Sequence, residues 1–306
     1  MRLAAVDVGS NTVHALVADV VRGRLVDVAH YVEMPELGSQ VAATGSIGPR
    51  ARTAIRALRS VVTQARAHNY EVLIAGATEA VRQASDREAF AREAGAAIGT
   101  PLRIIGANRE AELSFNGVAA NHAGRREWLM VDLGGASTEI AVGNARKMVR
   151  SATLPIGSGV LASAYFSDPP TLEDRARMRR AALRELAQAP DADVERLVAT
   201  GGTASNLPQV LAKRNPPTVL TTADLLTCET RLDSRKAAEV AAKVQLPPNR
   251  IKAMRAGVEV LLLLLDWYGL AVLHVSHQGL RHGMLQAYLE RGEDWWQAGS
   301  AGAEPG

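Results

Sequence analysis

The sequence feature that most constrains this chain is a glycine turn between two apolar runs, in residues 131–139. Residues 128–131 predict a buried strand, and residues 140–142 predict the strand that returns from the turn. Between them lie an acid, two adjacent glycines and two hydroxyl residues. Glycines allow a tight turn that brings backbone N–H groups close to an anion, so the pattern predicts a phosphate-binding loop. An ordinary hairpin turn is the alternative at this point.

A second copy of the pattern lies near the start of the chain. With an offset of 125 residues, Asp7 falls on Asp132 and Gly9 falls on Gly134. In both copies an apolar strand ends at the acid, and a glycine turn leads into a second strand. Such a repeat predicts two similar domains, each with its own phosphate loop.

Strands and helices alternate along the rest of the chain, which is typical of an α/β protein. The turn at Gly201-Gly202 follows a third apolar strand, residues 197–200, and a helix beginning at about Ala204 would direct its N-terminus toward an anion. The polar stretch 121–124 contains a glycine and marks the expected junction. The predicted domains are therefore 1–124 and 125–306, and the last helix of the second could pack back on the first.

The composition is that of a globular protein long enough for two domains. Of its 306 residues, 47% are hydrophobic and 22% are charged. A net charge of +3 suits an anionic substrate but is too small to predict nucleic-acid binding. Cys228 is the only cysteine, so no internal disulfide can form, and a reducing compartment is expected.

Neither a secretory signal nor a membrane span is predicted. The first apolar run contains Asp7, and the longest apolar run, residues 260–265, is too short to cross a bilayer. We therefore expect a cytoplasmic protein without a membrane partner.

Two further features allow more than one interpretation. Glu110 lies in the first turn of a predicted helix, where a carboxylate can stabilise the helix dipole or act in catalysis. The predicted helix 49–68 carries a row of arginines, which indicates a solvated face or a contact with a polyanion; these are Arg52, Arg56, Arg59 and Arg66. The spacing of His274, His277 and His282 matches no common zinc pattern.

Four segments in order along the chain resemble the exopolyphosphatase and guanosine pentaphosphate phosphatase (Ppx/GppA) family. They are residues 7–12 (DVGSNT), 108–111 (NREA), 132–139 (DLGGASTE) and 279–283 (GLRHG). The resemblance implies two actin-like, ribonuclease H-like domains of the actin/sugar-kinase/Hsp70 superfamily with an inter-domain cleft. It also identifies the short two-domain form, without the helical C-terminal domain of longer relatives.

The resemblance implies a hydrolase that cuts a terminal phosphoanhydride with Mg²⁺, or alternatively Mn²⁺, as cofactor. Glu110 matches the glutamate that activates water. Asp132 and Glu139 match acids that hold metal and help to place that water, and Asp7 is the corresponding metal-binding acid of the first loop. The implied phosphate-binding residues come from both loops and a late turn: Gly9, Ser10, Asn11, Gly134, Gly135, Ala136, Ser137 and Arg281.

Several positions depart from the family pattern. Arg109 stands where an acid is common, His14 where arginine is common, and Ala136 replaces a third glycine. His277 occupies a place that is usually acidic. None of these changes removes a residue that hydrolysis requires.

The leading functional expectation is release of orthophosphate from inorganic polyphosphate by a homodimer. A guanosine pentaphosphate (pppGpp) 5′-phosphohydrolase is the main alternative. The remaining alternatives are a kinase that transfers phosphate from ATP to a small acceptor and a non-catalytic actin-like nucleotide sensor.

Overall fold

The computed structural model describes residues 1–120, 126–145, 147–211 and 217–297. Contacts divide the chain into two compact units. Unit 1 comprises residues 1–117 and the segment that starts at Leu280, and unit 2 comprises residues 118–279. The junction predicted between residues 124 and 125 falls within 121–125, outside the described residues, so that boundary stays a prediction.

Unit 1 is built on a five-stranded mixed sheet in the order β3-β2-β1-β4-β5. The first three strands form an antiparallel meander, and β4 and β5 add in parallel. The strands are β1 (Arg2–Val8), β2 (Val13–Val21), β3 (Arg24–Glu33), β4 (Val72–Ala77) and β5 (Leu102–Ile104). Strand β1 is buried along almost its whole length, so side chains on both of its faces require cover.

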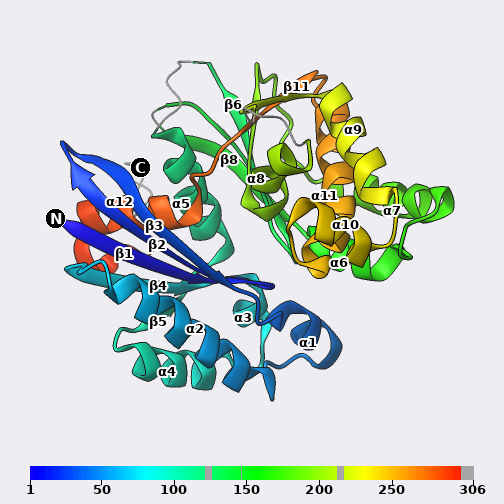
Figure 1. The fold of residues 1–306 in the computed structure, drawn as a ribbon. Helices are drawn as coiled ribbons and strands as arrows, with labels where there is room; N and C mark the ends of the chain where they lie inside the picture. Colours follow the sequence, from blue (N-terminus) through cyan, green and yellow to red (C-terminus); the bar gives the residue numbers. More distant parts are fainter. Residues whose placement is uncertain (121–125, 146, 212–216, 298–306) are drawn as a thin grey trace, which may run out of the picture. The chain divides into compact units, whose positions relative to one another are not determined.

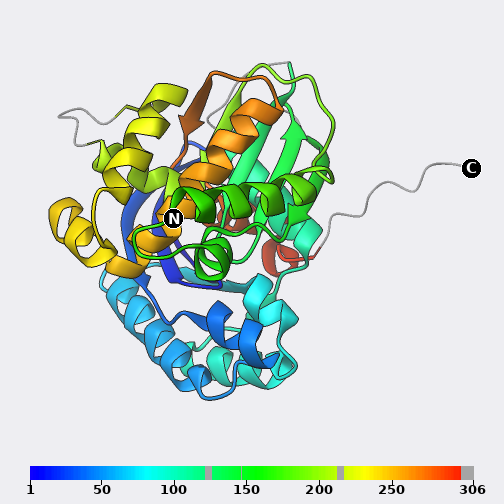
Figure 2. The same ribbon diagram turned by 90° about the vertical axis from the view of Figure 1, so that its right-hand side faces the viewer.

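Helices cover both faces of this sheet (Figure 1). They are α1 (Leu37–Thr44), α2 (Arg50–Arg66), α3 (Glu79–Gln83), α4 (Arg87–Ile98), α5 (Ala107–Ala119), α12 (Leu280–Arg291) and the short 3₁₀ turn η1 (Gly292–Asp294). Val6 and Val8 pack toward α2 and α4, which lie side by side in both ribbon views (Figure 1, Figure 2). Leu3 and Ala5 pack on the other face, against α5 and α12. Because side chains alternate along a strand, Asp7 belongs to the α5 and α12 face.

Unit 2 is built on a six-stranded sheet in the order β10-β11-β9-β6-β7-β8. Its strands are β6 (Trp128–Leu133), β7 (Thr138–Gly143), β8 (Met148–Leu154), β9 (Leu197–Thr200), β10 (Val219–Thr221) and β11 (Val272–Val275). Strands β6, β7 and β8 form an antiparallel meander, β9 and β11 add in parallel, and β10 closes the edge. The order β3-β2-β1-β4-β5 of unit 1 therefore recurs as β8-β7-β6-β9-β11 in unit 2, which has the additional edge strand β10. The sequence repeat predicts this similarity.

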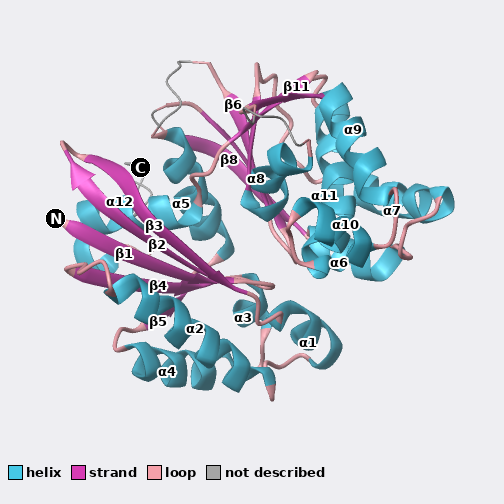
Figure 3. Cartoon of the chain, in the orientation of Figure 1, coloured by secondary structure: helices cyan, strands magenta, loops and turns pink. Residues whose placement is uncertain are grey.

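The helices of unit 2, cyan in Figure 3, and one face of its sheet share a single apolar core. They are α6 (Ser158–Tyr165), α7 (Leu172–Leu186), α8 (Gly201–Val210), α9 (Thr222–Asp233), α10 (Ala237–Val244) and α11 (Pro248–Trp267). Helix α11 packs on α6, α7, α8 and α9. Among the residues described, no helix is both long and apolar enough to cross a membrane.

Buried ion pairs tie the helices of unit 2 together. Arg175 of α7 pairs with Asp233 of α9 and with Glu259 of α11, at 2.7 Å for the second pair. Arg255 of α11, with only 1% of its side chain exposed, pairs with Asp168 at 2.8 Å. Each guanidinium offers several donors to several acceptors, so these charges remain compensated inside the core.

The periodic, apolar elements follow the sequence-based expectation, whereas the polar edge elements do not. The expected helix 49–68 is present as α2, and the capping box of Thr171 and Asp174 starts α7. The predictions missed β3, α1, β8, β10 and α10. Strand β3 lies at a sheet edge and is half exposed along its length, so it lacks the apolar run of a buried strand.

Two helices begin earlier than their sequences suggest. Helix α8 begins at Gly201, and α12 begins at Leu280, so Arg281 and His282 lie in a helix rather than in a turn. Gly283 looks like a turn residue in the sequence. Its absent side chain instead permits close packing, because a Cβ there would overlap the carbonyl oxygen of Leu113 in α5.

Replacement of Gly257 in α11 by alanine should destabilise the protein. A Cβ there would overlap the side chain of Thr203 in α8, with Thr203 Cγ2 at 2.7 Å. We expect Gly257→Ala to lower the free energy of unfolding by about 1–3 kcal/mol, as overpacking does, measured by urea denaturation. Gly106→Ala is the control, because an added Cβ there meets nothing within 4 Å. Equal stabilities of the two variants would contradict this packing.

Candidate active site

The first glycine turn joins β1 to β2 and packs against the start of α1. The Gly9 N–H donates to the Thr12 carbonyl at 2.9 Å, which closes the turn. The Ser10 carbonyl accepts from the Gly38 N–H at 2.6 Å, and a Cβ on Gly38 would lie 2.9 Å from Ser10 Cβ. The predicted phosphate-binding residues Gly9, Ser10 and Asn11 therefore share one turn held by backbone contacts.

Asp7, which directly precedes this turn, is paired with a cation. Arg281 Nη1 donates to Asp7 Oδ2 at 2.5 Å, and 9% of the Asp7 side chain is exposed. The two residues are far apart in sequence, but β1 and α12 bring them together. Two residues of the predicted site, one assigned to metal and one to phosphate, are thus in direct contact.

Glu110 lies in the first turn of α5 and is buried. Arg82 Nη1 donates to Glu110 Oε2 at 2.8 Å and to the Ile105 carbonyl at 2.7 Å. Arg82 also pairs with Glu79 of α3. Burial disfavours the charged guanidinium, but the attraction of Glu110 and Glu79 outweighs it and raises the pKa of Arg82. Arg82 is a residue that sequence reasoning missed, although it lies in α3, close behind β4.

The second glycine turn joins β6 to β7 and repeats the geometry of the first. The Gly134 N–H donates to the Ser137 carbonyl at 3.0 Å. The carbonyls of Gly134 and Gly135 accept N–H groups from the start of α6, among them Ser158 at 2.9 Å. A Cβ on Gly157 would overlap the Ala136 backbone, with Ala136 Cα at 2.5 Å. The predicted residues Gly134, Gly135, Ala136 and Ser137 are therefore held on the N-terminal end of α6.

Asp132 and Glu139 lie inside the paired strands rather than in the turn. They face each other across the antiparallel register of β6 and β7, and Ser137 Oγ donates to Glu139 Oε1 at 2.6 Å. Glu139 is buried and Asp132 is half-buried. Gly201, at a φ of +90°, brings the β9–α8 turn against Asp132, because a Cβ there would lie 3.1 Å from Asp132 Oδ1.

These two carboxylates suit Mg²⁺. Mg²⁺ prefers oxygen ligands and is commonly held by one or two carboxylates, with substrate phosphates and water completing its shell. Among the residues described, no group of three or more His, Cys, Asp or Glu side chains could hold a metal by itself. A pair of acids beside a phosphate loop is the donor set that this mode of binding requires.

Arg250 at the start of α11 is a second residue that sequence reasoning missed. A Cβ on Gly202 would overlap Arg250 Nη1, so the guanidinium lies directly against the third glycine turn and the N-terminus of α8. Burial lowers the pKa of the Arg250 guanidinium. A partly buried cation at a helix N-terminus is suited to bind an anion.

Arg109, one of the residues that depart from the family pattern, has structural contacts in unit 1, and so do two histidines of that unit. Arg109 is buried and donates to Glu112 Oε2 at 2.7 Å and to the Trp295 carbonyl, which fastens the chain after α12 to α5. His282 Nε2 lies 2.9 Å from Asp27 Oδ1, and His30 Nε2 lies 2.9 Å from Asp27 Oδ2.

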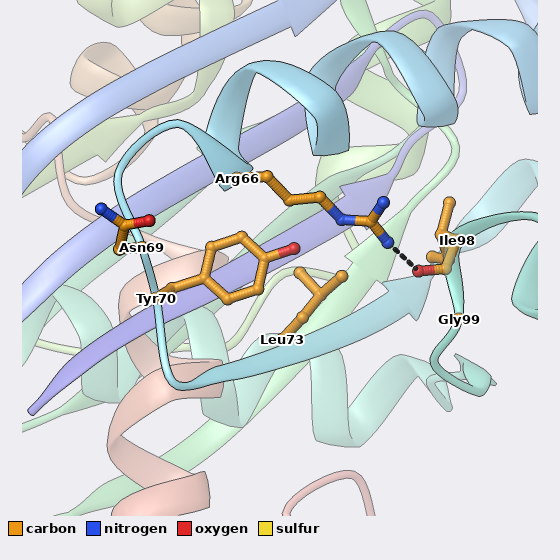
Figure 4. Close-up of a pocket in the computed structure, with 6 residues that line it drawn as sticks. All are labelled: Arg66, Asn69, Tyr70, Leu73, Ile98 and Gly99. Atoms are coloured by element: carbon orange, nitrogen blue, oxygen red, sulfur yellow. Dashed lines mark hydrogen bonds between the residues drawn. The ribbon is translucent and has the colours of Figure 1, made fainter.

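One open pocket in unit 1 lies away from these residues. It has a volume of about 330 Å³ and is lined by Arg66, Asn69, Tyr70, Leu73, Ile98 and Gly99 (Figure 4). Its Leu73 is near the start of β4, whereas the glycine turn and Asp7 are level with the end of that strand. The Arg66 guanidinium donates to the Ile98 carbonyl at 3.3 Å. The pocket contains none of the predicted site residues.

The structure thus assembles two sets of predicted site residues. Unit 1 holds Asp7, the first turn, Glu110 and Arg281, and unit 2 holds Asp132, Glu139 and the second turn. The catalytic, phosphate-binding and metal-binding roles of these residues stay predictions.

Comparisons with known proteins identify a family. The model of the Ppx/GppA phosphatase family matches residues 16–291. Exopolyphosphatase 2 of Mycobacterium tuberculosis is 37% identical over 194 residues, which are 58% of this chain and 60% of that protein. The chain therefore matches less than two thirds of the length of this curated relative.

Solved structures of related proteins have the same fold. A crystal structure of the Aquifex aeolicus member of the Ppx/GppA family has a TM-score of 0.80 at 27% identity and covers 96% of this chain and 99% of its own. An exopolyphosphatase from Cytophaga hutchinsonii has a TM-score of 0.85 at 22% identity and covers 95% and 98%. These likenesses and the two mixed sheets confirm the predicted fold class of two actin-like α/β domains.

Replacement of Asp27 by asparagine should reduce the acid sensitivity of folding. Hydrogen bonds from His282 and then His30 hold the pKa of Asp27 well below its ordinary value of 3.8. A depressed carboxyl pKa contributes stability above the unfolded pKa and loses it as the pH falls. Between pH 5 and 3, we expect the free energy of unfolding to fall less steeply for Asp27→Asn than for the wild type, measured by urea denaturation. Parallel pH profiles would contradict this contribution.

Proposed function

We propose that this chain is a phosphoanhydride hydrolase that releases terminal orthophosphate from inorganic polyphosphate. The chain belongs to the Ppx/GppA phosphatase family, because the model of that family matches residues 16–291. The observation that carries the proposal is the pair of equivalent glycine turns, Gly9–Thr12 and Gly134–Ser137, each preceded by an aspartate. In each turn, the N–H of the first residue donates to the carbonyl of the residue three positions later. The exopolyphosphatase of M. tuberculosis named above supports the choice of polyphosphate.

Phosphoryl transfer requires positioning and charge neutralisation more than covalent participation of the protein. In the proposed reaction, backbone N–H groups of each turn and the Ser10 hydroxyl bind non-bridging phosphate oxygens. Arg281 adds a charged donor. Mg²⁺, held by Asp132 and Glu139, would neutralise charge on the phosphates.

Glu110 is the proposed general base. It takes a proton from the water that attacks the terminal phosphorus, and the bond to the bridging oxygen breaks to release orthophosphate. Arg82 fixes the Glu110 carboxylate through Oε2 and the strand-to-helix connection through the Ile105 carbonyl. This contact orients the base and keeps its buried charge compensated.

A second candidate function is hydrolysis of pppGpp to ppGpp, which the two-part family description makes the natural competitor. Both reactions cleave a terminal phosphoanhydride, so the same residues would serve either. We therefore propose to measure kcat/KM for pppGpp and for polyphosphate. A higher kcat/KM for pppGpp would identify the nucleotide, rather than polyphosphate, as the substrate. The expected homodimer stays a prediction, to be checked by sedimentation.

Replacement of Glu110 by glutamine should abolish most of the phosphate release. The amide keeps the shape of the side chain but cannot accept the proton of the attacking water. We expect kcat for phosphate release from polyphosphate with Mg²⁺ to fall by about 10²–10⁴-fold, measured by an orthophosphate assay. Glu112→Gln is a control on the same helix, since Glu112 pairs with Arg109. Activity of Glu110→Gln equal to that of the wild type would exclude Glu110 as the base.

A further inference from the structure

The two glycine hairpins have the same backbone hydrogen bond but differ in the charge of the side chains at their paired positions. The register pairs Asp132 with Glu139 in β6 and β7, and it pairs Asp7 with His14 in β1 and β2. The hairpin of unit 2 therefore places two carboxylates opposite each other. The hairpin of unit 1 places one carboxylate opposite an imidazole, which is a poorer donor set for Mg²⁺.

The Asp7 carboxylate already has a cationic partner. Arg281 Nη1 lies 2.5 Å from Asp7 Oδ2, and 9% of the aspartate and 21% of the arginine side chain are exposed. A divalent cation on the same carboxylate would lie close to a guanidinium, and like charges at that separation repel strongly where water is scarce.

The helix that carries Arg281 is fixed on two sides. Gly283 lets α12 approach α5 so closely that any side chain there would overlap the Leu113 carbonyl. His282 Nε2 lies 2.9 Å from Asp27 Oδ1 on β3. These contacts involve the two residues that directly follow Arg281, so its backbone has little freedom. The contact with Asp7 then orients the guanidinium.

The guanidinium retains donors beyond those that Asp7 uses. Arginine has five N–H groups, and Arg281 Nε is buried without a hydrogen-bond partner among the residues that the structure describes. A buried donor without a partner has a substantial free-energy cost unless a ligand or water supplies the acceptor.

We infer that Asp7 is a positioning residue rather than a metal ligand, and that it holds Arg281 so that the guanidinium binds a phosphate oxygen of the substrate without a metal at the first loop. This inference rests on the proposed function and makes it more specific. It assigns unlike roles to two aspartates at equivalent positions: Asp132 binds the divalent cation, and Asp7 orients an arginine.

The test is the binding of inorganic tripolyphosphate to the full chain in EDTA, measured by titration calorimetry. Without metal, an aspartate that is only a metal ligand repels the polyanion, so Asp7→Asn would bind as tightly as the wild type or more tightly. If Asp7 positions Arg281, the neutral amide holds the guanidinium less well. Asp7→Asn and Arg281→Ala should then each weaken binding, the latter by about tenfold, the scale of a charged hydrogen bond.

The double variant Asp7→Asn/Arg281→Ala should bind no more weakly than Arg281→Ala alone, because both changes act through one guanidinium. Asp132→Asn is the matched control. We expect it to leave binding in EDTA unchanged or tighter and to lose the gain in affinity that Mn²⁺ gives the wild type. Asp7→Asn should keep that gain.

Unchanged or tighter binding by Asp7→Asn in EDTA would overturn the inference, as would additive losses in the double variant or no binding by the wild type. If Asp7→Asn does not fold, as judged by its Tm, Arg281→Lys replaces it. Lysine keeps the positive charge but lacks the planar group of several N–H donors that arginine has, so Arg281→Lys should weaken binding. Unchanged binding by this variant would again overturn the inference. Tripolyphosphate binding in EDTA without any hydrolysis of polyphosphate in Mg²⁺ would instead remove the proposed function and leave the inference standing.

Discussion

The close approach of one backbone segment to another at each glycine turn is the constraint on which both candidate loops depend. At the second turn the chain has no room for a Cβ at Gly157, and the turn carbonyls accept N–H groups from the start of α6. At the first turn Gly38 has the corresponding role beneath Ser10. In both units, a glycine outside the loop lets a neighbouring segment pack against the loop. These glycines therefore restrict the conformation of the loop as much as the glycines within it do.

The two units show how one backbone can carry two electrostatic environments. Their sheets share strand order and hairpin geometry, and the paired positions coincide at the same offset. In unit 2 the acid of the first strand faces a second acid, whereas in unit 1 it faces a histidine and contacts an arginine. Only a few side chains beside each turn differ between the two units. A small number of substitutions can therefore change the chemistry of a loop while the backbone of its turn stays the same.

Much of the fold could be predicted from the sequence because the buried strands and amphipathic helices carry their own periodicity. The two glycine hairpins, α2 and α7 follow that signal, and the repeat indicated the two units. Strand β3 and helices α1 and α10 are short or half exposed, so their sequences resemble those of loops. The contacts of Arg82 with Glu110 and of Arg281 with Asp7 join distant segments. No local pattern encodes these contacts. Motifs could therefore nominate Glu110, Asp7 and Arg281, but they could predict neither Arg82 nor the pairing of Arg281 with Asp7.

The discontinuous composition of unit 1 affects the order in which the chain can fold during synthesis. Met284, Leu285 and Trp295 complete the apolar cluster that includes Leu3 and Ala5, yet the whole of unit 2 is translated before them. At 5–20 residues per second this interval lasts roughly 10–30 s. Throughout it, one face of the first sheet lacks its final cover and is open to unwanted association. The cover of that face is therefore completed only after α12 has left the ribosome.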